Sequence, residues 1–87
     1  MLTVELLERF TETAKRLNYR VRQEWLGGSG GGACEFGGQR WIFIDLALST
    51  SEQLHQISEA LRDDPRLSTV TLSVAEREHL NLQRRVA

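Results

Sequence analysis

The chain has 87 residues, which is enough for one small domain spanning positions 1–87. Its 40% hydrophobic and 26% charged residues exclude a disordered tail, a collagen-like fibre and a coiled coil. The 11 lysines and arginines nearly balance the 12 aspartates and glutamates, and the net charge of −1 argues against electrostatic binding of nucleic acid.

The sequence shows no sign of membrane insertion or secretion. No apolar run approaches the ~18 residues of a membrane span. The first residues contain neither a basic segment nor a long apolar stretch, so we expect no signal peptide. The single cysteine, Cys34, has no partner for an internal disulfide, which is typical of a reducing compartment. We therefore expect a cytoplasmic protein without a membrane segment.

The N-terminal segment predicts a helix followed by a strand. Apolar residues recur at spacings of three and four over 4–17, as on one face of an amphipathic helix: Leu7, Phe10, Ala14 and Leu17. Thr3 is the expected N-cap, and Asn18, which tolerates a left-handed conformation, suits the exit. From Tyr19 the period changes to two, which predicts a half-buried strand over 19–26 with its arginines on the exposed face.

A glycine-rich segment and a hairpin follow. Residues 27–32 include five of the seven glycines, and they predict a loop because no side chain there can fill a core. Strands over 33–36 and 40–46 are joined through Gly37-Gly38, a pair that supplies the positive φ of a tight hairpin. In this register Cys34 faces Trp41, and Glu35 faces Arg40. Residues 41–44 are apolar on both faces, which predicts the central strand.

The C-terminal half carries two capping boxes. Ser49 and Glu52 open a helix that Asp63-Asp64-Pro65 ends, while Ser73 and Glu76 open a final helix. Between them, 67–72 is rich in β-branched residues and predicts a short strand. If this strand joins beside the strand of Ile44, the helix between them makes a right-handed parallel crossover. The expected fold is α+β: a two-layer α/β sandwich in the order α-β-β-β-α-β-α, with a central antiparallel hairpin and helices on one face.

The glycine-rich segment matches two motifs by composition. Around Ser29 it fits G-x-S-x-G, but the nucleophile elbow requires a strand–turn–helix context in a much larger sheet. It also fits G-x-G-x-x-[GA], but no helix follows to receive a pyrophosphate, and no P-loop lysine is present. We interpret it as a structural loop, with a flexible lid or partner-binding loop as the alternative.

Cys34, Asp45 and His55 suggest a nucleophile, an orienting carboxylate and a base. Beside aromatic residues, however, Cys34 is expected to be a neutral core thiol. Asp45 is expected to cap a turn or to face solvent, and His55 to pair with Glu59 on the helix surface. His79 is expected to be partly buried. These groups lie on different elements, so we expect no metal, no cofactor and no catalytic residue.

Four aromatic residues suggest a platform for stacking bases, with three arginines for phosphate contacts. These residues are Tyr19, Trp25, Phe36 and Trp41, with Arg20, Arg22 and Arg40. Nearby Glu24 and Glu35 cancel much of this positive charge. We therefore expect the aromatic residues to pack in the core.

The segment 25–62 resembles a family of short bacterial proteins of uncharacterised function, which share the glycine-rich loop, the cysteine and the run "IFIDLALSTSEQL". More distantly, the hairpin and the following helix resemble ImmA/IrrE-type zinc metallopeptidases, whose helix carries H-E-x-x-H. That resemblance aligns Glu59 with the catalytic glutamate, but Ser58 and Arg62 stand where both zinc ligands would lie. It implies a zincin-like scaffold without metal chemistry.

The sequence favours a non-enzymatic protein-interaction or regulatory module that binds a protein partner or a second copy. An unburied apolar patch around Trp25 and Trp41 would be its surface. One alternative is a small-ligand binder or degenerate metallopeptidase-like enzyme, and another is a nucleic-acid-binding module that needs the arginines at 20, 22, 40, 84 and 85 on one surface. The candidate ligand- or partner-binding residues are Trp25, Ser29, Cys34, Trp41, His55 and Glu59.

Overall fold

The computed structural model describes residues 2–28 and 31–86, with side chains up to residue 81. The elements in chain order are α1 (Thr3–Arg16), β1 (Tyr19–Glu24), β2 (Gly32–Phe36), β3 (Gln39–Asp45), α2 (Thr50–Arg62), the 3-10 helix η1 (Pro65–Thr69) and α3 (Val74–Val86). The expected α+β class is confirmed, as are the three helices and the first three strands in their order.

The prediction of a fourth strand over 67–72 was wrong. It forms η1 and a short extended connection instead of joining the sheet. The cause is local: Pro65 occupies the first turn, and the Asp64 side chain caps that turn by accepting a hydrogen bond from the Arg66 N–H. Turn chemistry at Asp64-Pro65 therefore overrides the β-branched content that follows.

The sheet has three strands in the order β1-β3-β2, with β3 in the centre as predicted. The β2–β3 hairpin has the predicted register, with Cys34 opposite Trp41 and Glu35 opposite Arg40. Gly37 and Gly38 adopt φ values of 60° and 76°, the positive values that a two-residue turn requires. The parallel neighbour of β3 is β1, not the predicted strand around Val70.

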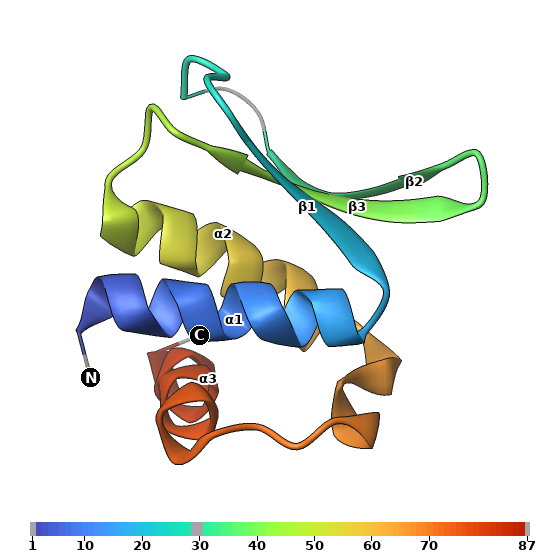
Figure 1. Ribbon diagram of the computed structural model, residues 1–87. Coiled ribbons are helices and arrows are strands. Elements are labelled where there is room, and N and C mark those ends of the chain that lie inside the picture. The colour runs from blue at the N-terminus through green and yellow to red at the C-terminus, as the bar shows by residue number, and fades with distance from the viewer. Residues whose placement is uncertain (1, 29–30, 87) are drawn as a thin grey trace.

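Helices cover one face of this sheet (Figure 1). α1 and α2 lie side by side beneath the sheet, and α3 packs against the helices on the side away from it. Among the described elements, no helix lies over the opposite face of the sheet. The molecule thus has a covered sheet face and an open one.

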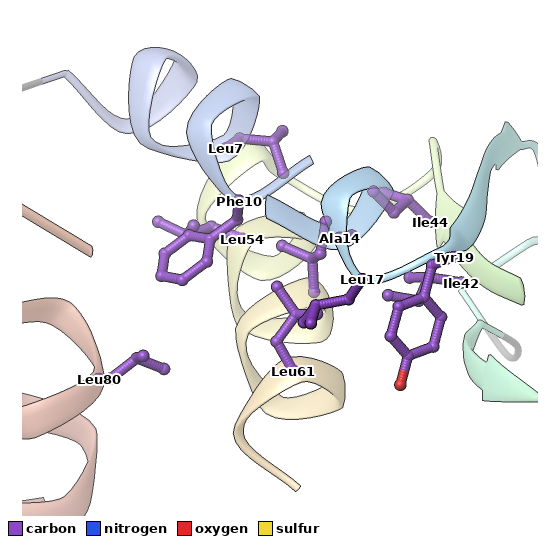
Figure 2. Close-up of a cluster of buried hydrophobic side chains, with 11 residues drawn as sticks. Leu7, Phe10, Ala14, Leu17, Tyr19, Ile42, Ile44, Leu54, Leu61 and Leu80 are labelled. Carbon is purple, nitrogen blue, oxygen red and sulfur yellow. The ribbon is translucent and has the colours of Figure 1, made fainter. Parts of the chain in front are cut away.

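The core forms between α1, α2 and the covered face of the sheet (Figure 2). Phe10, Ile42 and Ile57 have exposed fractions of 0%. The buried hydrophobic side chains are Leu7, Phe10, Ala14, Leu17, Tyr19, Ile42, Ile44, Leu54, Ile57, Leu61 and Leu80. This set contains the whole face predicted for the first helix, because residues at that spacing point to the same side.

The ends of the helices follow the predicted capping in all but one case. Ser49 with Glu52 and Ser73 with Glu76 make the expected reciprocal hydrogen bonds. Asn18 has the expected positive φ of 68°. The exception is Thr3, which already lies inside α1, because the N-cap is Leu2 and makes no side-chain capping bond.

Glu76 also joins α3 to α1. Glu76 is 2% exposed, and its carboxylate accepts a hydrogen bond of 2.6 Å from the Thr13 hydroxyl in the last turn of α1. A buried carboxylate is tolerated only when its oxygens are satisfied, and the Ser73 hydroxyl and N–H occupy the other oxygen. The capping box therefore also positions the last helix.

Asp64 ties the start of β1 to the end of α2. The Tyr19 hydroxyl donates to its carboxylate at 2.8 Å, and Arg66 donates through its backbone N–H and its side chain. Arg40 of β3 approaches at 3.3 Å. The hydrogen bonds from Arg66 outweigh burial and lower the pKa of Asp64 from 3.8 to about 2, while burial and the bond to Asp64 raise the pKa of Tyr19.

We expect Asp64→Asn to lower the free energy of unfolding by roughly 2 kcal/mol at pH 7. The folded-state pKa lies below the ordinary value, so the contribution of the carboxylate is complete above about pH 4 and is lost as the pH falls through about 2. Urea denaturation at several pH values measures this loss, and the neighbouring, exposed Asp63→Asn is the control. A deficit of Asp64→Asn that does not change between pH 5 and about 2 contradicts the assignment.

Candidate functional site

The open face of the sheet is formed by alternate residues of the three strands. Ile42 and Ile44 point into the core, so Trp41 and Phe43 between them point the other way. The strand pairings bring further residues onto that face. The open face carries Arg20, Arg22 and Glu24 from β1, Trp41 and Phe43 from β3, and Gly32, Cys34 and Phe36 from β2.

Three aromatic rings form a stack across this face. Phe36 and Trp41 have ring centroids 5.7 Å apart and planes 4° from parallel, and Trp41 and Phe43 have centroids 5.8 Å apart and planes at 15°. The guanidinium of Arg20 lies over the Trp41 ring, 5.5 Å from its centroid. Phe36 remains 60% exposed. Within the described part of the chain, the indole N–H of Trp41 is shielded from solvent and has no hydrogen-bond acceptor.

This arrangement corrects the expectation that the aromatic residues pack in the core. Tyr19 does so, but Phe36 is exposed, and Trp25, which lies just beyond the end of β1, is 76% exposed. Cys34, expected to be a core thiol, is also exposed. It does face Trp41, as predicted, but none of the described helices lies over the face that they share.

The arginines do not gather into one cationic surface. Arg22 forms an ion pair with Glu24 at 2.7 Å on the open face. Arg40 belongs to the other face of the sheet, where it lies 3.3 Å from both Glu35 and Asp64. Arg84 and Arg85 lie among the residues whose side chains are not described. The nucleic-acid interpretation therefore loses Arg40, one of the cations that it required.

At the end of β3, Asp45 organises the glycine-rich loop. Its carboxylate is fully buried and accepts hydrogen bonds from the backbone N–H groups of Leu26 at 2.9 Å, Gly28 at 2.6 Å and Ala47 at 2.9 Å. Burial alone would raise the pKa of Asp45, but the three N–H donors outweigh it and hold the pKa below its usual value. The predicted capping of the turn is confirmed, whereas exposure to solvent was wrong.

Gln56 of α2 continues this anchoring. Its side-chain oxygen accepts the Asp45 N–H at 3.1 Å. A Cβ on Gly31 would lie 2.4 Å from the Gln56 amide nitrogen and 3.0 Å from the Phe43 carbonyl oxygen. The loop therefore returns to the sheet against α2, at a point where only glycine fits. Ser29, a candidate from the sequence, lies outside the described residues.

His55 and Glu59 lie on α2, beneath the covered face, so they are separated by the sheet from Cys34 and Trp41. Glu59 forms its ion pair with Arg62, one turn further along α2. Arg62 also donates to the Leu80 carbonyl oxygen of α3 at 3.3 Å. The residues proposed to hold a small ligand, Cys34 and His55 among them, therefore do not lie around one site.

The positions aligned with zinc ligands are occupied by structural contacts. Ser58 is fully buried, and Arg62 bridges α2 to α3. His79 is partly buried as predicted: it lies edge-on to Phe10, and burial, followed by the charges of Arg62 and His55, lowers its pKa. Among residues 2–28 and 31–81, no three histidine, cysteine or acidic side chains gather where they could hold a metal ion.

Comparison with protein-family models, with curated proteins and with solved structures gave no match for this chain. Over the part of the chain that the structure describes, no helix combines the length and the apolar character needed to cross a membrane. The site therefore has to be interpreted from its own chemistry.

The sequence contained a signal for one residue that our candidates omitted. Phe43 is two positions after Trp41 in the same strand, and this spacing places both rings on one face. Asp64 lacked such a signal, because its partners Tyr19 and Arg40 are distant along the chain and meet it only in the folded molecule.

We expect Gly31→Ala to destabilise the protein more than Gly32→Ala does. Both glycines have positive φ, 117° and 103°, so both alanines are strained, but only the Cβ at position 31 meets neighbouring atoms. Gln56 would have to move from its bond to Asp45, and the Phe43 carbonyl is fixed in β3. Thermal denaturation of the two variants measures the difference, which we expect to be about 1–3 kcal/mol. Equal destabilisation of the two variants contradicts the close packing at Gly31.

Proposed function

We propose that the protein is a non-enzymatic, cytoplasmic protein-interaction module and that the open face of its sheet is the binding surface. The observation that carries the proposal is the stack of Phe36, Trp41 and Phe43 on a face that no described helix covers. Tryptophan, phenylalanine and arginine are the residue types that concentrate in the centre of protein interfaces.

The energetics of the stack support a partner. A parallel ring pair contributes about 0.5–1.5 kcal/mol, whereas complete burial of an aromatic side chain contributes about 1.5–3 kcal/mol. Phe36 is 60% exposed, so much of the free energy of burying its ring is gained only when a partner covers it. Trp25, just beyond the end of β1, is a further large apolar side chain exposed to solvent.

The chemistry of the open face favours protein over nucleic acid. Of its two arginines, Arg22 is paired with Glu24, and Arg20 lies over the Trp41 ring. Binding to phosphates depends on several cations that release counterions, and this face offers Arg20 and a neutralised pair. An interface built on aromatic side chains with a polar rim needs no such excess of charge.

Site-specific photocrosslinking tests the proposal. A benzophenone amino acid is placed at Phe36, or at Val74 on α3 as a control, because the two side chains are 60% and 61% exposed. In cells that naturally make the protein, we expect a discrete protein adduct from position 36 and none from position 74. In extracts of those cells, added unlabelled chain should compete for the adduct, whereas unlabelled Phe36→Asp should not.

Two results would contradict the proposal: equal adducts from both positions, or no protein adduct from position 36. The mass of the adduct gives the class of partner, since twice the chain mass of 9.9 kDa indicates self-association.

A further inference from the structure

We propose that the occupant of the open face is a second copy of this chain, packed face to face about a two-fold axis. This inference rests on the proposed function and specifies its partner. In such a dimer the two sheets form the centre, and α1 and α2 of each copy lie on the outside. The contact is isologous, so each copy contributes the same residues.

An isologous contact requires a surface that is complementary to itself, and the open face meets that requirement. Its middle is the apolar stack of Phe36, Trp41 and Phe43, which can pack against an identical stack. On its edge strand β1, one cation and one anion are already paired at 2.7 Å. A surface built for an acidic or basic partner would present a field of one sign. Arg20 adds one further cation to each face, where its guanidinium lies over the Trp41 ring, and the chain's net charge of −1 adds little repulsion between two copies.

The shape of the face also fits. Two sheets pack face to face about 10 Å apart with their strands rotated by roughly 30°, and side chains from both faces fill the space between them. Beyond the rings, the open face carries Cys34 and Gly32 on β2. These small residues leave room beside the rings of one copy for the rings of the other.

The size of the face sets the strength expected of the dimer. Stable interfaces bury about 800 Å² on each partner, which corresponds to roughly 20–30 residues a side. Three strands of 6, 5 and 7 residues, with alternate residues facing outward, offer fewer than that even when Trp25 is added. We therefore expect a dimer that dissociates on dilution, with a dissociation constant in the micromolar range.

The single cysteine provides a direct test on the purified protein. Cys34 is exposed on the open face of one chain and would be covered in the dimer. Sedimentation is measured while the protein concentration is raised from about 1 to about 300 µM, together with the rate of Cys34 alkylation by a maleimide. We expect a shift from monomer to dimer and, over the same range, a fall of about tenfold in the alkylation rate.

Matched variants test whether the loss of Cys34 reactivity comes from contact between two open faces. Phe36→Asp should leave the protein monomeric and Cys34 reactive at every concentration, whereas Val74→Asp, an equally exposed apolar position, should behave as the parent chain does. In a Cys34→Ser/Thr71→Cys variant, the thiol lies between η1 and α3, and its alkylation should not depend on concentration. Circular dichroism verifies that each variant is folded.

Two results overturn the inference. One is a protein that stays monomeric at the highest concentration with Cys34 fully reactive, and the other is a dimer that leaves Cys34 reactive. If the purified chain is monomeric but the crosslinker at Phe36 captures a different protein in cells, the proposed function stands and the second copy is excluded. If position 36 also gives no protein adduct, both proposals fail.

Discussion

The constraint on which the structure depends is a mismatch between its central strand and its helices. Residues 41–44 of β3 are apolar on both faces of the sheet, but α1 and α2 cover only one of these faces. The covered face receives Ile42 and Ile44, which are fully buried against the two helices. Trp41 and Phe43 are left on the other side, where they pack against Phe36 and beneath Arg20. The core and the candidate site are therefore the two faces of the same seven-residue strand.

The remaining elements hold that strand in place through polar groups. At one end of the sheet, the Asp64 carboxylate accepts hydrogen bonds from Tyr19, Arg40 and Arg66. These bonds connect β1, β3 and η1. At the other end, the Asp45 carboxylate accepts hydrogen bonds from three backbone N–H groups and so fixes the start of the glycine-rich loop. Both carboxylates have lowered pKa values, because hydrogen bonds to the ionised form outweigh the effect of burial. Each is satisfied by several donors, so its burial is compatible with stability.

Local signals predicted most of the fold. The capping boxes at Ser49 and Ser73, the positive φ at Gly37-Gly38 and the hairpin register all depend on residues close in sequence. The parallel pairing of β1 with β3 joins residues about 20 positions apart and had no local signature. Which side of β3 the helices would cover was also undetermined, since both sides are apolar. The exposure of Cys34 and Phe36 follows from that choice, and for this reason their predicted burial was wrong.

The two apolar faces of β3 have a consequence for the pairing of the strands. In most sheets a slip of one residue moves polar side chains into the core, and this penalty maintains the register. Here a slip would exchange Ile42 and Ile44 for Trp41 and Phe43, so hydrophobicity alone hardly distinguishes the two alignments. The register must be held by the Gly37-Gly38 turn before the strand, by the contact of Arg40 with Asp64 on the covered face and by the anchored Asp45 at the end of the strand. Those few residues decide which side of the sheet faces outward.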